Sequence, residues 1–178
     1  MNYEMLDRSV LQKRADVDER VSTLDGLPIP AIIELNIFGA CNRSCDFCPV
    51  SNPEVYTNVN EGLEVYLARK LISDLQEINF SGIILFSAFS EPFLHKKLFE
   101  LVSLFRLGLP ECGVHIVSNG DAIKAKPVLI SRAMAAGVSQ LSLSLYDGDH
   151  QAEYFLKIMD DQLLDADKRK VVLKRRYQ

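Results

Sequence analysis

The sequence predicts an α/β fold, in which a parallel sheet of about five strands alternates with helices and curls into an incomplete, TIM-like (β/α) barrel. Two observations lead to this prediction. Short apolar segments of strand length alternate with longer segments in which apolar residues recur every three or four positions. In addition, polar or cysteine-containing motifs directly follow the strand-like segments, where the loops of a parallel (β/α) fold gather. We therefore expect right-handed crossovers and a functional face at the carboxyl ends of the strands.

Each predicted strand is a short apolar run bounded by polar or turn-forming residues. In residues 140–145 leucine and serine alternate, so the leucines share one face while the serines, among them Ser144, point to the barrel interior. The five predicted strands cover residues 31–38, 82–87, 114–117, 140–145 and 170–175.

Four helices are predicted from apolar residues at helical spacing. The third, residues 127–136, begins at Pro127 and stops at Gly137, and these residue types are typical of a first helical turn and of a helix end. The apolar stripes of the others are Leu67, Leu71, Leu75 and Ile78; Leu98, Leu101, Val102 and Phe105; and Ala152, Phe155, Met159 and Leu163.

We divide the chain into an N-terminal helical extension, residues 1–28, and a core, residues 29–178. The composition is that of one soluble domain, with 178 residues of which 48% are hydrophobic and 25% charged. No apolar run reaches the length of a membrane span, and charged residues occupy the place of a signal peptide, so we predict a cytoplasmic protein. The net charge of −4 gives no general attraction to nucleic acid or to an anionic membrane.

Three cysteines follow the first predicted strand. Cys41, Cys45 and Cys48 form a CxxxCxxC pattern, and such short spacings let three thiolates hold three irons of a [4Fe–4S] cubane. The fourth iron would stay open, because Cys112 lies far along the chain in a turn. A structural zinc site and three unrelated buried cysteines are the alternatives. Zinc sites usually combine two CxxC-like halves or include histidine, whereas the three histidines here have no ligand-like spacing.

With Phe47 immediately before the last cysteine, this pattern resembles the CxxxCxφC signature of the radical S-adenosylmethionine enzymes, where φ is aromatic. The resemblance implies that S-adenosylmethionine chelates the open iron and that one electron splits it into a 5′-deoxyadenosyl radical. It further implies hydrogen abstraction from a peptide or small metabolite and a flavodoxin or ferredoxin as reductant. In this reading Cys41, Cys45 and Cys48 are the catalytic and metal-binding residues, and Phe47 packs near the adenine.

The segment after the second strand resembles the family's Gly-Gly-Glu-Pro motif, with both glycines replaced, by Phe89 and Ser90. The resemblance implies that this loop, including Ser90, binds the cofactor and that Glu91 accepts a hydrogen bond from its methionyl ammonium. The alternative is that the segment only caps the helix that follows, with a proline in its first turn.

Two further segments resemble family motifs. Asn119, in Ser-Asn-Gly after the third strand, and Ser144, in Ser-Leu-Tyr-Asp at the end of the fourth, would fix the cofactor carboxylate or ribose. Their alternatives are an ordinary Asn-Gly turn and a hydroxyl bonded to nearby backbone. The basic run 168–176 is typical of a solvated strand edge, although Arg175 could reach a cofactor carboxylate from there.

Family members commonly have six βα units, and only five strands are predicted here. An open parallel sheet exposes an edge, so we expect the chain to be a fragment, a truncated homologue, or a protein whose barrel is completed by a partner or dimer mate. Two other classes of function remain open. One is a non-catalytic iron–sulfur or S-adenosylmethionine-binding module that works with a partner chain, and the other is a zinc-stabilised α/β domain.

Overall fold

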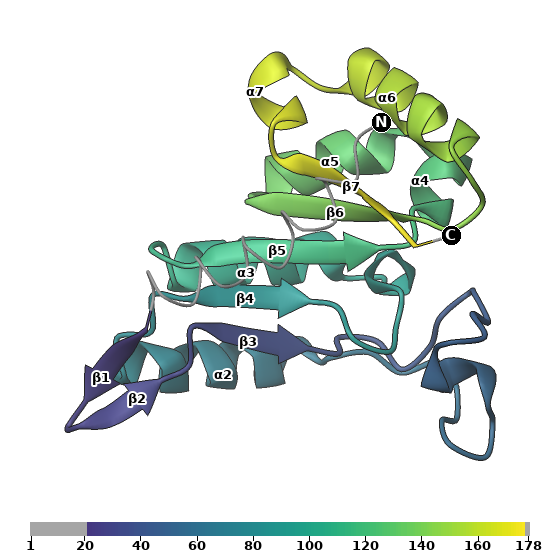
Figure 1. Cartoon of the computed structure of the whole chain (residues 1–178). Coiled ribbons are helices and arrows are strands. Elements are labelled where there is room, and N and C mark those ends of the chain that lie inside the picture. The colour runs from purple at the N-terminus through teal and green to yellow at the C-terminus, as the bar shows by residue number, and fades with distance from the viewer. Residues whose placement is uncertain (1–20, 177–178) are drawn as a thin grey trace.

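Five parallel strands form the central sheet of the computed structural model, which describes residues 21–176 (Figure 1). The strands follow each other in chain order across the sheet, and each pairs in parallel with the next. This confirms the predicted α/β fold with five strands. The strands are β3 (Ile32–Leu35), β4 (Ile83–Phe86), β5 (Gly113–Ser118), β6 (Gln140–Leu145) and β7 (Val171–Arg175).

Helices connect the strands, and the longer ones match the predicted stripes. α2 contacts α3, α3 contacts α5 and α5 contacts α6, so neighbouring crossovers pack side by side. The short helices α4 and α7 were not predicted. The helices are α2 (Val65–Glu77), α3 (Leu98–Gly108), α4 (Asp121–Ala125), α5 (Val128–Ala136), α6 (His150–Gln162) and α7 (Asp165–Lys168), and the 3-10 turns are η1 (Pro49–Ser51) and η2 (Pro92–Leu94).

The hydrophobic core lies between the sheet and the helices, which in Figure 1 cover the far side of β4, β5 and β6. Phe86 of β4 and Phe105 of α3 are fully buried and meet edge to face, with their ring centroids 5.7 Å apart. Burying aromatic side chains of this size contributes a large share of core stability. This contact fixes β4 against α3, and with it the position from which the loop after β4 leaves the sheet.

A β-hairpin precedes the sheet. β1 (Ser22–Leu24) and β2 (Leu27–Ile29) pair in antiparallel register, and the two turn residues Asp25 and Gly26 have φ angles of +51° and +81°. This corrects the prediction of a helical extension over residues 1–28 for its last part, because an Asp-Gly turn favours a hairpin. The rest of that prediction, residues 1–20, lies outside the described residues.

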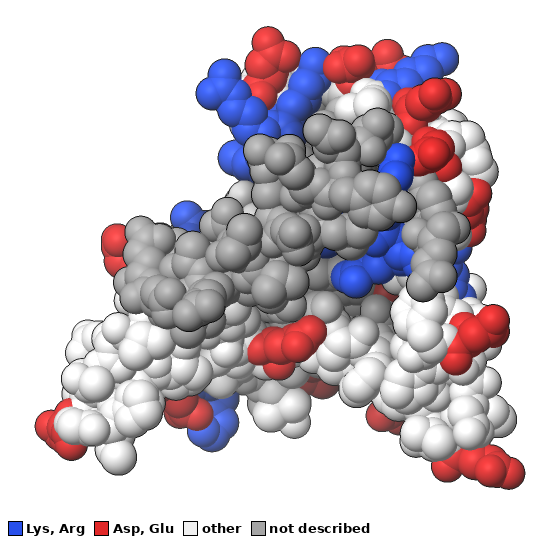
Figure 2. Space-filling model, viewed as in Figure 1, with Lys and Arg blue, Asp and Glu red and all other residues white. Residues whose placement is uncertain are grey.

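Charged side chains of both signs are interspersed over the face shown in Figure 2, and those drawn in red and blue form no broad patch of one sign. No helix within residues 21–176 combines the length and the apolar character that crossing a membrane requires.

Candidate active site

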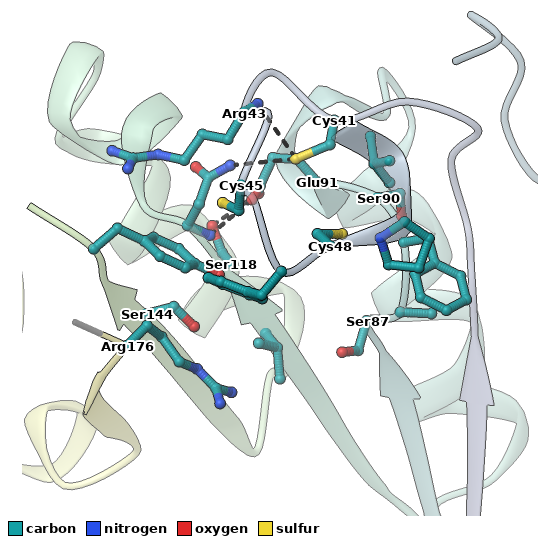
Figure 3. A pocket seen from close by; sticks show the side chains of 18 residues that line it. Cys41, Arg43, Cys45, Cys48, Ser87, Ser90, Glu91, Ser118, Ser144 and Arg176 are labelled. Carbon is teal, nitrogen blue, oxygen red and sulfur yellow. Dashed lines mark hydrogen bonds between the residues drawn. The ribbon is translucent and has the colours of Figure 1, made fainter. Parts of the chain in front are cut away.

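A pocket of about 290 Å³ opens where the loops after β3, β4, β5 and β6 meet (Figure 3). Its volume is close to the lower end of the range for small-molecule sites. The structure places all of the predicted site residues at this one pocket, while their chemical roles remain predictions. These residues are Cys41, Cys45, Phe47, Cys48, Ser90, Glu91, Asn119 and Ser144.

The cysteine loop leaves β3 and is held by the returning segment before α2. The Gly39 N–H donates to the carbonyl of Glu61 at 2.8 Å, and the Val59 N–H donates to the Gly39 carbonyl at 2.9 Å. A Cβ on Gly39 would lie 2.7 Å from the Val59 oxygen, so the two backbones approach closely only because residue 39 is glycine. The Cys41 N–H donates to Asn58 Oδ1 at 3.1 Å. These bonds set the point from which the loop enters the pocket.

The three thiols of this loop are partly buried and line the same pocket. Burial raises the pKa of Cys41 and of Cys45, so both thiols hold their protons more tightly than exposed cysteine and iron would displace those protons on binding. Within residues 21–176 no three His, Cys, Asp or Glu side chains are grouped closely enough to hold one metal ion. The thiolates of a cubane bind three different irons and do not converge on one centre, so this donor set fits a cluster better than a single zinc ion.

Cys112 lies outside the pocket. Its side chain is buried, and its Sγ donates to the Phe80 carbonyl at 3.2 Å near the amino ends of β4 and β5, whereas the pocket lies at the carboxyl ends. The pocket therefore contains three cysteines, as the prediction of an open fourth iron requires.

Glu91 links two loops beneath the cysteines. One carboxylate oxygen, Oε1, accepts from Phe93 N–H at 3.1 Å and from Ser118 Oγ at 2.8 Å, and Oε2 accepts from Asn119 N–H at 2.8 Å. The residue is only 1% exposed, and this burial raises its pKa to about 7. Glu91 therefore caps η2, as the alternative interpretation of its motif held, and also lines the pocket, where Oε2 can accept a second hydrogen bond.

The raised pKa of Glu91 predicts a pH-dependent stability. The ordinary pKa is 4.5, so between pH 4.5 and about 7 the unfolded chain ionises while the folded chain keeps the proton. The free energy of unfolding therefore falls as the pH rises through this window, and the contribution of Glu91 to it is constant at higher pH. The free energy of unfolding of the wild type, minus that of Glu91→Gln, should fall by more than about 1 kcal/mol between pH 4.5 and 8 in urea titrations. A difference that is constant or rises with pH would contradict the assignment.

Asn119 reaches the cysteine loop from the end of β5. Its Nδ2 donates to Asn42 Oδ1 at 2.8 Å and lies 3.8 Å from Cys41 Sγ, while its Oδ1 accepts from the Asp121 N–H at 2.9 Å. The residue is therefore both part of a turn and a donor directed at a predicted cluster ligand.

Two serine hydroxyls are available inside the pocket. The Oγ atoms of Ser90 and Ser144 are buried and have no hydrogen-bond partner among the described residues. Ser144 lies near the Tyr146 hydroxyl, but the two do not meet in hydrogen-bonding geometry, and burial raises the pKa of that tyrosine. Buried polar atoms without partners are uncommon, and they fit a site that a polar ligand completes.

Aromatic side chains form one wall of the pocket. Phe47 is 70% exposed and stacks on Tyr146, with ring centroids 6.1 Å apart and an interplanar angle of 20°. An exposed ring beside unsatisfied hydroxyls is suited to a ligand such as S-adenosylmethionine, which joins an aromatic base to polar groups. The residues present therefore fit both the cluster and the cofactor.

The loop after β4 follows a strained path. Ala88 directly precedes Phe89 and Ser90, the residues that replace the family glycines. Its φ angle is +71°, a value that residues other than glycine seldom adopt. The positive φ falls on Ala88, which also lines the site, and not on Phe89 or Ser90.

Sequence reasoning missed several residues of this region. Arg43 lines the pocket, and its guanidinium contacts Asp121 and Asp147 from two other loops. The only feature of the sequence that could have singled out these three residues is that each lies inside or directly beside a predicted motif. At the end of β7, Arg176 lines the pocket, whereas Arg175 points away and pairs with Asp149 at 2.5 Å. Successive strand residues face opposite sides, so the predicted arginine was one position off.

No protein-family model matches the chain. A relative from Niallia circulans, an S-adenosyl-L-methionine-dependent 2-deoxy-scyllo-inosamine dehydrogenase, is 29% identical over 143 residues, which are 80% of this chain and 54% of that protein. A relative from Siniperca chuatsi, the S-adenosylmethionine-dependent nucleotide dehydratase RSAD2, is 34% identical over 100 residues, which are 54% of this chain and 26% of that protein. The chain thus spans about half the length of the first relative and about a quarter of the second.

The fold matches solved structures of BtrN. The crystal structure of BtrN in complex with AdoMet and 2-DOIA superimposes with a TM-score of 0.68 and 27% identity, over 82% of this chain and 56% of that chain. An open conformation of BtrN gives a TM-score of 0.59 and 25% identity over the same shares. The shared sheet, the cysteine spacing and the S-adenosylmethionine-dependent relatives lead to one conclusion: the chain belongs to the radical S-adenosylmethionine family.

Proposed function

We propose that this chain is the cofactor-binding core of an enzyme that uses a [4Fe–4S] cluster and S-adenosylmethionine to abstract hydrogen from a substrate. The observation that carries the proposal is the convergence of eight residues, from the loops after β3, β4 and β5 and from the end of β6, on one pocket. When bound, the cluster and S-adenosylmethionine would supply an electron and a 5′-deoxyadenosyl radical, which is chemistry that no side chain provides.

Each part of the pocket has a role in this proposal. The thiols of Cys41, Cys45 and Cys48 would hold the cluster at the mouth of the site. The unsatisfied hydroxyls of Ser90 and Ser144 would accept or donate hydrogen bonds to the amino acid or ribose part of the cofactor.

Glu91 and Asn119 both line the pocket and are joined by a hydrogen bond from the Asn119 N–H to Glu91 Oε2. Oε2 accepts this one bond and keeps a second lone pair that could accept the predicted bond from the methionyl ammonium. Asn119 keeps its amide directed at Cys41 and would orient the cluster. The stacked rings of Phe47 and Tyr146 would cover the adenine and exclude water from it.

A small polar metabolite is the proposed substrate class, in preference to a peptide. The names of both relatives specify small polar substrates, an inosamine and a nucleotide. The Arg176 guanidinium lines the pocket and forms no ion pair with any residue of the described part of the chain, so it can serve a polar or anionic substrate.

The pocket residues account for the cluster and the cofactor, but not for the cover of the open sheet edge or for the electron donor. We propose that further protein, either a continuation of the chain or a partner subunit or dimer mate, covers the open edge of the sheet. A flavodoxin or ferredoxin would deliver the electron, and the reducing cytoplasm would keep the thiols available for iron. A non-catalytic module that works with a partner chain is the second candidate, which the half-length match to the first relative favours.

Electron paramagnetic resonance tests the proposal. The anaerobically reconstituted and dithionite-reduced protein should give a [4Fe–4S]⁺ signal that shifts when S-adenosylmethionine is added. Cys45→Ala should lose the signal, because one of the three iron ligands is missing, while Cys112→Ala should keep it, because that thiol lies outside the pocket.

Other outcomes separate the alternatives. A signal that does not change when S-adenosylmethionine is added would indicate an inert cluster and favour the non-catalytic module. Bound zinc in place of iron would refute the proposal. Release of 5′-deoxyadenosine would distinguish a working enzyme from a module that only binds the cofactor.

A further inference from the structure

A network of charges surrounds Arg43 in the middle of the cysteine loop. The guanidinium makes a two-pronged contact with Asp121, through Nε and Nη2 at 2.6 Å each. It makes another with Asp147, through Nη1 and Nη2 at 2.8 Å each. Lys124 lies 3.6 Å from Asp121 and 3.2 Å from Asp147, so the four charges balance. The Arg43 side chain is 18% exposed and its plane also lies over the Tyr146 ring, with Cζ 5.1 Å from the centroid.

These contacts join three loops that are distant in the sequence. Arg43 belongs to the loop after β3, Asp121 begins α4 after β5, and Asp147 follows β6. The hydrogen-bonding partners are 78 and 104 residues apart. The guanidinium therefore bridges the carboxyl ends of three strands at the rim of the pocket.

Few other hydrogen bonds within residues 21–176 hold this part of the loop, and Asn42 makes the ones that reach another element. Among the described residues, those that tie residues 42–47 to other elements come from the side chains of Asn42 and Arg43. The backbone bond from Cys48 N–H to the Cys45 carbonyl at 2.8 Å is local and fixes the turn but not its place in the fold. Arg43 makes four of the six bonds to other elements, so it contributes most of the hydrogen bonding that orients this part of the loop.

We propose that Arg43 is a positioning residue, which anchors the cysteine loop to Asp121 and Asp147 so that the three thiols face the pocket before any cluster is bound. That the thiols take a cluster rests on the function proposed above, but the anchoring itself does not. The guanidinium suits this role because its planar fork can bind two carboxylates at once, whereas a lysine ammonium is a point charge without that geometry. Partly buried two-pronged pairs of this kind also hold their geometry better than exposed single pairs.

The test begins with the metal-free protein. In Arg43→Gln we expect amide hydrogen exchange of residues 41–48 and alkylation of Cys45 by iodoacetamide to rise about tenfold, because the loop opens more often. Exchange in β4 and β5 should stay unchanged. Asp147→Asn removes one of the two carboxylates and should give a smaller rise, and Arg43→Lys should recover part of the protection. The matched control is Arg132→Gln, since Arg132 lies over the Phe99 ring of α3 and away from the pocket.

Iron loading gives the second readout. If Arg43 positions the thiols, Arg43→Gln should take up less iron under reconstitution and Arg43→Lys should restore part of it, while Arg132→Gln matches the wild type. Equal exchange of residues 41–48 in the wild type and Arg43→Gln would overturn the proposal. If Arg43→Gln unfolds entirely, Asp147→Asn decides: a selective rise in loop exchange supports the proposal, and no rise overturns it. A wild type that binds no cluster refutes the proposed function without touching the exchange result.

Discussion

Glu91→Ala is expected to lower the free energy of unfolding of the metal-free protein by about 3 kcal/mol. Three donors lose their common acceptor in this variant, namely the N–H groups of Phe93 and Asn119 and the hydroxyl of Ser118. The carboxylate is buried, so water cannot replace it fully, and each unsatisfied donor costs desolvation energy. Urea unfolding followed by circular dichroism at pH 8 measures the change.

The matched control for this variant is Glu64→Ala. Glu64 also precedes a helix, α2, but its side chain forms no capping hydrogen bond. We expect a change of about 0.5 kcal/mol or less. If Glu91→Ala were equally mild, the carboxylate would not be what holds the loops after β4 and β5 together.

The position of Glu91 also explains how the site is assembled from separate loops. Its bonds reach Ser118 and Asn119 at the end of β5, Asn119 continues to Asn42, and Asn42 and Arg43 both donate to Asp121. A single chain of hydrogen bonds thus runs from the loop after β4, through the loop after β5, into the cysteine loop. Because each loop supports the next, a change in one is expected to loosen the others.

The strands and longer helices were predictable because their signals are local. The leucine and serine alternation of β6 and the apolar stripes of α2, α3 and α6 follow from periodicity alone. The cysteine spacing is equally local. The hairpin at β1 and β2 was missed although Asp25-Gly26 carried the signal, because the charged residues earlier in the chain, with scattered apolar ones among them, favoured a helix for the whole extension.

The rest of the site could not be predicted for two physical reasons. The contacts of Arg43 join residues 78 and 104 positions apart, and no periodicity within one segment specifies such a pair. Whether Arg175 or Arg176 faces the pocket depends on strand register, where a shift of one residue exchanges the two faces.

Gly120→Ala is expected to destabilise the metal-free protein by about 3 kcal/mol, as the sum of a strained backbone and an overpacked core. Gly120 has a φ angle of +76°, and an added Cβ would lie 2.4 Å from Cζ of Phe155, a fully buried ring of α6. The ring has little freedom to move away. Since Gly120 lies between Asn119 and Asp121, the same change should displace both from the cysteine loop and reduce iron uptake. Urea unfolding and iron content after reconstitution measure the two effects.

Gly26→Ala separates the two causes. Gly26 has a similar φ angle, +81°, but an added Cβ would meet nothing within 4 Å, so this variant carries the backbone strain alone and should cost about 1 kcal/mol without affecting iron uptake. Replacing the ring with a smaller side chain in Gly120→Ala/Phe155→Leu should recover part of the lost stability, because the effects of substitutions at two contacting residues are not independent. Equal costs for Gly26→Ala and Gly120→Ala would mean that the ring yields easily and that close packing of α6 against the loop after β5 does not hold Asn119 and Asp121 in place.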